Sequence, residues 1–157
     1  MSERSVRHSS FVVERRYDAS PERVFAAWAE PDAKRRWFSG PEEWSAFEHE
    51  LDFRPGGREI NRVGPPEGPL HTFDARYHDI VPARPIIYSY DIYLDERRVS
   101  VALATVELVA DGPGTRLIFT EQDAILDDGE LTRDRARGTR DLLDALAAEL
   151  ERVASTG

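Results

Sequence analysis

The sequence predicts an α+β fold in which a curved antiparallel sheet of about six to seven strands wraps a long C-terminal helix. Three observations support this prediction. Short alternating segments fill the middle of the chain, Gly- and Pro-containing turns separate them, and an amphipathic segment without proline ends it. Two short helices are expected between the first and second strands. The pairing must be antiparallel, because parallel strands need crossovers of roughly a dozen residues or more and these turns are much shorter.

The N-terminal part predicts a strand followed by a helix. Phe11–Tyr17 is rich in β-branched and aromatic residues, which is typical of a strand. A helix is expected to follow, because the Ser20 hydroxyl can accept a hydrogen bond from a free helical N–H and Pro21 has no N–H to leave unpaired. One face of this helix carries the apolar residues Val24, Phe25, Trp28 and Ala29.

A second short helix is predicted over residues 32–38, because Pro31 interrupts the first helix and can begin another. Its consecutive basic residues Lys34, Arg35 and Arg36 are interpreted as a solvated helix face. Contact between this basic face and an anionic membrane surface, or with an acidic head group of a ligand, is the alternative.

Residues 44–122 predict further strands joined by turns. These strands are expected over Trp44–Phe53, Arg58–Val63, His71–Ile80, Ile86–Leu94, Arg98–Val109 and Thr115–Gln122. Residues 64–69 must form a loop, because their prolines lack the N–H groups that a sheet needs. Alternation along the strand that begins at Ile86 places Tyr88 and Tyr90 on the same apolar face.

The C-terminal segment Leu131–Val153 predicts one helix, roughly 33 Å long at 1.5 Å per residue. Its apolar stripe consists of Leu142, Leu143, Leu146, Ala147, Leu150 and Val153. Gly138 is unusual inside a helix, where glycine costs about 1 kcal/mol relative to alanine. Close packing of the helix against another element is the preferred explanation, and space left for a cavity is the alternative.

Composition limits the class of protein. The chain of 157 residues fits one domain, taken as 1–157 with a core over 11–153. It has no cysteine, and its 21 Lys and Arg against 30 Asp and Glu give a net charge of −9, which opposes binding to nucleic acid. No apolar run approaches the ~20 residues of a membrane span, and the N-terminus lacks the apolar core of a signal peptide. We therefore expect a cytoplasmic protein without stable membrane insertion.

Several segments carry a resemblance to a known family. They are Ala19–Trp28 (ASPERVFAAW), Glu30–Phe38 (EPDAKRRWF), Phe53–Arg58 (FRPGGR), Gly114–Gln122 (GTRLIFTEQ) and Gly138–Leu143 (GTRDLL). In this order they resemble the helix-grip superfamily of birch-pollen-allergen and START-like (SRPBCC) domains, in its branch of activator of heat-shock protein 90 ATPase homologues. The resemblance implies a hydrophobic cavity between the sheet and the long helix. It implies no single reaction, because lipid carriers, polyketide cyclases and hormone receptors all belong to the superfamily.

The leading hypothesis is that such a cavity binds a small hydrophobic or amphipathic molecule of lipid or polyketide type, with no cofactor. Aromatic residues gather in the short-helix region and the central strands. Thr139 offers a hydroxyl where the long helix should cross the sheet, and Leu143 belongs to the apolar stripe of that helix. The candidate ligand-binding residues are Trp37, Phe38, Trp44, His71, Phe73, Tyr88, Tyr90, Thr139 and Leu143. Ordinary core packing is the alternative for the aromatic residues. For His71 the alternatives are a place at the cavity mouth or a solvated loop end.

Two other functions remain open. A cyclase, aromatase or hydrolase-like enzyme needs an acid, base or hydroxyl inside the cavity, and Glu121, His71, Tyr88 or Tyr90 could supply it. No catalytic residue is assigned, because Glu107 and Glu121 are expected on the solvent face of their strands, paired with arginines. A role as a heat-shock ATPase co-chaperone or stress-response protein follows only by family analogy, and the chain has no room for the second module of the eukaryotic activator.

The histidines do not predict a metal site. His71 and His78 are seven residues apart, so on one strand they face opposite ways, and His8 and His49 lie elsewhere in the chain. No metal is therefore expected. Homodimerisation through an exposed strand edge is left open by the sequence.

Overall fold

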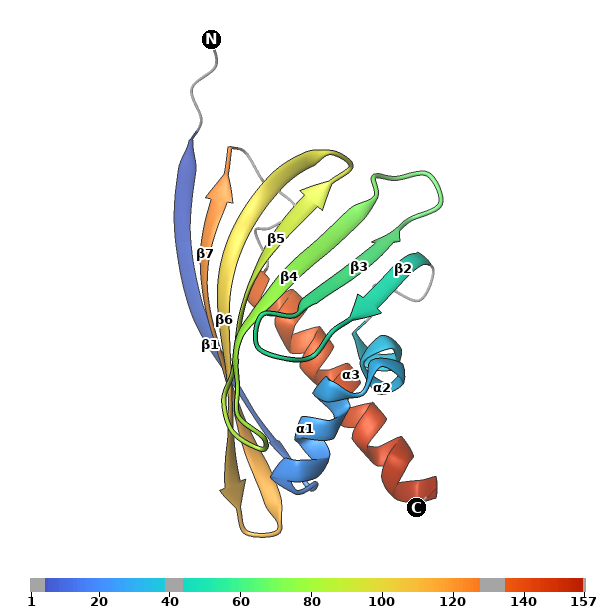
Figure 1. Ribbon diagram of the computed structural model, residues 1–157, viewed down its shortest axis with the longest axis vertical. Helices are drawn as coiled ribbons and strands as arrows, with labels where there is room; N and C mark the ends of the chain where they lie inside the picture. The colour runs from blue at the N-terminus through green and yellow to red at the C-terminus, as the bar shows by residue number, and fades with distance from the viewer. Residues whose placement is uncertain (1–4, 39–43, 128–134, 157) are drawn as a thin grey trace.

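The computed structural model describes residues 5–38, 44–127 and 135–156. Its antiparallel sheet has seven strands in the order β1-β7-β6-β5-β4-β3-β2, and Figure 1 shows how the sheet curves around α3. The strands are β1 (Val6–Tyr17), β2 (Ser45–Leu51), β3 (Arg58–Gly64), β4 (His71–Ile80), β5 (Ile86–Leu94), β6 (Arg97–Asp111) and β7 (Gly114–Leu126). The helices of the described residues are α1 (Pro21–Ala29), α2 (Pro31–Trp37) and α3 (Arg135–Thr156). The predicted α+β class, the order of its elements and the antiparallel pairing are confirmed.

The first and last strands are longer than predicted. β1 begins at Val6, upstream of the expected start, and β7 continues to Leu126, beyond its expected end. These extensions pair with each other, and His8 lies opposite Ala124. The polar residues at the start of β1 are not typical of a strand, but their side chains are exposed to solvent while their backbones pair with β7 along one edge.

The start of α1 is as predicted. The Ser20 hydroxyl accepts a hydrogen bond from the backbone N–H of Arg23 at 3.2 Å, and Pro21 is the first helical residue. α2 begins at Pro31, so the two short helices adjoin and their axes differ in direction (Figure 1).

α3 packs on one face of the sheet and contacts β1, α1 and α2. The Tyr17 hydroxyl of β1 donates a hydrogen bond to the backbone carbonyl of Leu143 at 2.8 Å. The Arg23 guanidinium of α1 donates to the carbonyl of Leu150 at 3.1 Å. Residues 131–134, which the sequence assigns to the same helix, lie outside the described residues.

The basic face predicted for α2 is partly wrong. Arg35 and Arg36 are exposed, but the Lys34 side chain is only 1% exposed. Its ammonium donates to Glu59 Oε1 at 2.9 Å and lies 4.4 Å from the centre of the Phe38 ring. It also lies over the Trp28 and Trp37 rings, at 5.0 and 5.6 Å from their centres. Lys34 is buried because it shares the inward face of α2 with Trp37, where aromatic faces and a carboxylate take the place of water.

Glu59 on β3 is the centre of this buried polar cluster. Besides Lys34, it accepts hydrogen bonds from the Tyr77 hydroxyl at 2.7 Å and contacts His49 Nε2 at 2.9 Å. Burial alone would raise the pKa of Glu59, but the Lys34 charge and these hydrogen bonds outweigh burial and lower it to about 2. Glu59 is therefore ionised at neutral pH, and the Lys34–Glu59 ion pair joins α2 to the sheet.

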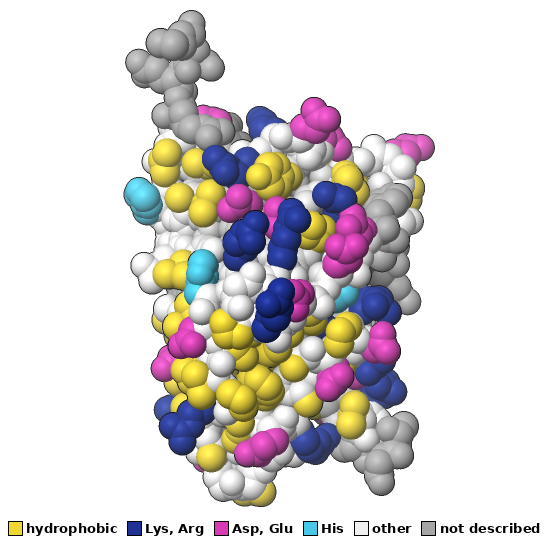
Figure 2. Space-filling model, in the orientation of Figure 1, with side chains coloured by type: hydrophobic (Ala, Val, Ile, Leu, Met, Phe, Trp, Pro, Cys, Tyr) yellow, Lys and Arg dark blue, Asp and Glu magenta, His cyan; other side chains and the backbone are white. Residues whose placement is uncertain are grey.

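The molecular surface carries both signs of charge. Figure 2 shows basic and acidic side chains intermixed on the visible face, without a large patch of one sign. Ion pairs also join neighbouring strands, such as Arg58 on β3 with Asp74 on β4 at 2.9 Å. Such exposed pairs join the side chains of neighbouring strands but add little to the stability of the sheet.

Candidate functional site

A cavity of about 710 Å³ lies between the sheet, α2 and α3. Its aromatic lining comes from both helices and strands and comprises Trp28, Trp37, Phe38, Trp44, Phe73, Tyr88, Tyr90 and Phe119. Leu142, Leu143 and Ala145 close it from α3. A volume of this size is typical of small-molecule sites in proteins.

All the residues predicted to bind a ligand lie on the wall of this one cavity. The sequence placed them in five separate segments, and the curvature of the sheet around α3 brings them together. Their contact with a ligand remains a prediction. Arg36, from the predicted basic face of α2, also lines the cavity, and so do Asn61 and Arg135, which were not predicted to do so.

The aromatic wall is built of rings in mutual contact. Phe73 lies at the centre, with ring centroids 4.7 Å from Tyr90 and 4.9 Å from Phe38. Tyr88 and Tyr90, two residues apart on β5, lie 5.9 Å apart. Such edge and offset contacts are favourable beyond the burial of the rings, so they hold the shape of the wall.

The polar part of the wall begins with the phenols predicted on β5. The Tyr88 side chain is only 3% exposed, and its hydroxyl has no hydrogen-bond partner among the described residues. Burial raises the pKa of Tyr88 well above its usual value, so the phenol stays protonated. It is therefore an available donor at the surface of the cavity.

The second phenol belongs to a buried cluster that joins β5, β6, β7 and α3. The Tyr90 hydroxyl donates to Glu121 Oε1 at 2.5 Å and accepts from Arg135 Nη1 at 2.9 Å. Arg135 Nη2 also donates to the Ser100 hydroxyl at 2.5 Å. Burial alone would lower the pKa of Arg135, but Tyr90, Glu121 and Asp123 outweigh burial and raise it. Arg135 is therefore a permanent positive charge in the wall.

The expectation that both strand carboxylates face solvent is right for Glu107 and wrong for Glu121. Glu121 is fully buried because it lies on the inward face of β7, with Asp123 two residues further on the same face. Glu121 lies opposite Ala104 of β6, whose small side chain leaves room for it. Burial, followed by the hydrogen bond and the negative charge of Asp123, raises the pKa of Glu121 to about 8. Glu121 is therefore mainly protonated at neutral pH.

Comparison with known proteins places this geometry in a family. The family model described as Activator of Hsp90 ATPase homolog 1-like protein matches residues 18–151. The chain belongs to this family. The resemblance stated from the sequence is thereby confirmed. A comparison with curated proteins found no match.

Solved structures share the fold of this Activator of Hsp90 ATPase homolog 1-like chain. An uncharacterized protein from Rhizobium leguminosarum is 46% identical, with a TM-score of 0.91 over 96% of this chain and 99% of that one. The Mll3558 protein from Rhizobium loti is 44% identical, with a TM-score of 0.85 over 92% of this chain and 99% of that one. A Staphylococcus aureus protein of unknown function, SA2116, shares the fold at 18% identity and a TM-score of 0.79, covering 96% and 98% of the two chains.

In this Activator of Hsp90 ATPase homolog 1-like chain, Gly138 does not serve close packing, which was the preferred explanation. A Cβ atom added to Gly138 would meet no atom of another element within 4 Å, and the residue lines the cavity. The alternative explanation, space left for a cavity, is compatible with this position, because Gly138 is an exposed residue on the cavity wall.

His71 lies at the cavity wall, with its ring 4.5 Å from that of Trp44. Burial lowers the pKa of His71, outweighing the opposing charge of Asp95, so the imidazole is neutral at physiological pH. The other histidines lie elsewhere, and His78 contacts the Ser89 hydroxyl. Within the described ranges, no three His, Asp or Glu side chains lie close enough together to hold a metal ion.

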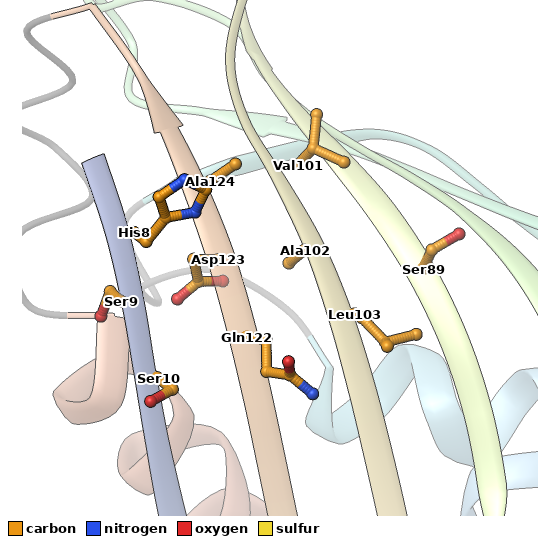
Figure 3. A pocket seen from close by; sticks show the side chains of 10 residues that line it. All are labelled: His8, Ser9, Ser10, Ser89, Val101, Ala102, Leu103, Gln122, Asp123 and Ala124. Atoms are coloured by element: carbon orange, nitrogen blue, oxygen red, sulfur yellow. The ribbon is translucent and has the colours of Figure 1, made fainter. Parts of the chain in front are cut away.

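A second hollow, of about 550 Å³, includes side chains from the solvent-exposed face of the sheet. Its lining includes a row across four strands, in which Gln122 lies opposite both Ser10 and Leu103, and Leu103 lies opposite Ser89 (Figure 3). It brings together none of the residues predicted to bind a ligand. None of the described helices is long and apolar enough to cross a lipid bilayer.

Proposed function

We propose that this protein binds a small amphipathic molecule, of lipid or polyketide type, in the cavity between the sheet and α3. One observation carries the proposal: a cavity of about 710 Å³ has an almost continuous aromatic wall interrupted by a few buried polar groups. An apolar pocket with a few convergent polar groups is typical of a small-molecule site. Membership of the family is compatible with this role, and equally with a co-chaperone role.

The tryptophans allow a direct test without a label. Trp28, Trp37 and Trp44 are the only tryptophans of the chain, and all of them line the cavity. Titration with a panel of fatty acids, aromatic polyketides and polycyclic aromatics should change the tryptophan emission for at least one class. Native mass spectrometry should then detect a complex with one molecule bound.

A pair of α3 variants separates cavity binding from surface binding. Gly138→Phe adds a ring at the cavity wall and should abolish the emission change. Ala148→Phe adds the same ring to the exposed side of α3 and should leave it intact. If Gly138→Phe binds every ligand as well as the wild type does, the molecules bind elsewhere and the proposal fails.

A second candidate function is acid–base catalysis on the bound molecule. It is favoured by Glu121, a buried acid connected to the cavity wall through the Tyr90 hydroxyl at 2.5 Å. A carboxyl group with a pKa near the working pH suits general acid–base chemistry. Incubation of each bound polyketide with the protein, followed by mass spectrometry, would detect cyclisation with loss of water. Product formation that survives Glu121→Gln would contradict this role.

A further inference from the structure

The cavity wall contains no uncompensated positive charge among the described residues. Its charged lining groups are Arg36, Arg135 and Asp141. Arg36 donates to both carboxylate oxygens of Glu149, at 3.0 and 2.7 Å. Asp141 adds a negative charge. The balance around Arg135 therefore decides whether the wall attracts an anion.

Arg135 faces a pair of carboxyl groups that are both on β7. Glu121 is 0% exposed and Asp123 is 3% exposed. Glu121 Oε1 accepts from the Tyr90 hydroxyl, whereas no donor group of another described residue lies against Glu121 Oε2 or either Asp123 oxygen. Two adjacent buried carboxylates cannot both be ionised without a large cost. One proton held between Glu121 Oε2 and Asp123 satisfies oxygens from both residues, and the proximity of Asp123 contributes to the raised pKa of Glu121.

A pair that holds one proton carries one negative charge, which balances the charge of Arg135. The described groups that face it are Tyr88 and Tyr90 on β5, Ser100 on β6 and Arg135 on α3. On the other side of β7, the strand β1 places the uncharged residues Ser9 and Phe11 opposite the pair. The phenols are uncharged at neutral pH. Counted over the described residues, the cluster is therefore electrically neutral.

The neutral cluster still has donors to offer. A guanidinium has five N–H donors, and among the described residues two of those of Arg135 are used, for Tyr90 and Ser100. The Tyr88 hydroxyl, next to Tyr90 on the same face, has no acceptor among the described residues. An oxygen atom placed here can accept hydrogen bonds without changing any partner already present.

We propose that the end of the cavity formed by Tyr88, Tyr90 and Arg135 binds an uncharged carbonyl oxygen, as in an aryl ketone or quinone, and discriminates against a carboxylate. This inference rests on the proposed ligand-binding function. A ketone oxygen accepts the spare donors of Arg135 and Tyr88 and leaves the cluster neutral. A carboxylate brings a second negative charge beside the Glu121–Asp123 pair, and the two charges repel more strongly there because that pair is buried.

Three probes of similar size test the inference: 2-acetylnaphthalene, 2-naphthoate and 2-ethylnaphthalene, titrated at pH 7 with calorimetric detection. The ketone should bind about tenfold more tightly than the ethyl compound, because it gains a charge-assisted hydrogen bond. It should also bind about tenfold more tightly than the carboxylate. Arg135→Gln should reduce ketone affinity to that of 2-ethylnaphthalene, whereas Arg140→Gln, on the exposed side of α3, should not change it.

A double substitution tests whether the negative charge of the Glu121–Asp123 pair excludes a carboxylate. Glu121→Gln combined with Asp123→Asn removes the negative charge opposite Arg135, so 2-naphthoate should then bind at least as tightly as the ketone. A measurement on the unmodified protein avoids any folding defect of that variant. Between pH 7 and about pH 9 the pair loses its proton, and the affinity for 2-naphthoate should fall more than that for the ketone.

The outcomes separate this inference from the proposed function. If 2-ethylnaphthalene and 2-acetylnaphthalene bind equally well, or 2-naphthoate binds the wild type as tightly as the ketone does, the carbonyl site is wrong while cavity binding stands. Unchanged ketone affinity in Arg135→Gln would also overturn it. If none of the three probes binds but a fatty acid or polyketide of the panel does, the carbonyl site is wrong while cavity binding stands. If no member of the panel binds either, the proposed function fails together with the inference.

Discussion

At the scale of single residues, the sequence predicts side chains on regular strands better than those whose partners are distant. Alternation placed Tyr88 and Tyr90 on the inward face of β5, and both are buried there. The same alternation along β7 runs from Leu117 through Phe119 to Glu121, so it could have placed Glu121 inside as well. Carboxylates are usually exposed, and that general tendency outweighed the positional signal. For Lys34 no such signal exists, because the seven residues of α2 give no clear face.

Removal of the Lys34 charge should destabilise the protein strongly. Lys34→Met leaves the Glu59 carboxylate buried without its cation, which should lower the free energy of unfolding by about 3–5 kcal/mol. Urea denaturation followed by circular dichroism measures this change. Arg35→Met, on the exposed side of the same helix, is the control and should change it by less than about 0.5 kcal/mol. Equal effects of the two substitutions would show that the buried ion pair does not stabilise the fold.

Glu121 should make stability fall as the pH rises. Its pKa is raised from 4.5 to about 8 on folding, so its contribution is fully present below pH 4.5 and is lost as the pH rises through 8. Between pH 5.5 and 8.5 the wild type should therefore lose roughly 2 kcal/mol or more relative to Glu121→Gln, which cannot ionise. Urea denaturation at both pH values measures the difference. Glu107→Gln, on the exposed face of β6, should keep the wild-type dependence, and a Glu121→Gln curve parallel to the wild type would refute the assignment.

At the scale of elements, the sequence predicted the secondary structure of each segment but not the hydrogen bonds that join the segments. The apolar stripe of α3 was visible as a pattern, and Leu143, Leu146 and Leu150 are indeed buried. The hydrogen bonds from Tyr17 to Leu143 and from Arg23 to Leu150 join residues more than a hundred positions apart. No local pattern contains such pairs, because they depend on how the sheet curves.

Substitution of Gly138 tests how much stability α3 loses by having a glycine at the cavity wall. Because a Cβ atom there meets nothing within 4 Å, Gly138→Ala should gain helix propensity without a clash and stabilise the protein by about 1 kcal/mol. The thermal midpoint measures this gain. At Gly57 the added Cβ would lie 1.9 Å from the Asp52 carbonyl oxygen, so Gly57→Ala should destabilise. A loss of stability in Gly138→Ala would mean that the glycine is required for packing after all.

At the scale of the whole molecule, the cavity follows from the architecture, and its polar chemistry does not. A curved sheet that packs on one long helix was predictable from the order of the elements, and the predicted aromatic residues all line the resulting space. The cluster of Tyr90, Glu121 and Arg135 requires the strand order β7-β6-β5 and the start of α3 at one place. Sequence spacing does not specify that meeting point.

Because the cavity lies between the sheet and α3, occupancy should stabilise the entire fold. A ligand present at 100 times its Kd should raise the free energy of unfolding by about 2.7 kcal/mol if it binds only the folded state. With 2-acetylnaphthalene as the probe, the thermal midpoint should rise with ligand concentration. The Gly138→Phe variant should show no rise, and an equal rise in that variant would indicate binding outside the cavity.

The Lys34 ammonium lies against Trp28, Trp37 and Phe38, the same rings that line the cavity. The Lys34–Glu59 ion pair therefore keeps these rings in place, because a ring that rotated away would leave the buried ammonium without the contacts that compensate for its lost hydration. The shape of this part of the cavity wall is thus fixed before a ligand binds. A ligand must therefore fit the fixed shape of the aromatic wall on this side of the cavity. The protein should distinguish guests by their shape more sharply than a pocket lined by flexible methionine or leucine side chains would.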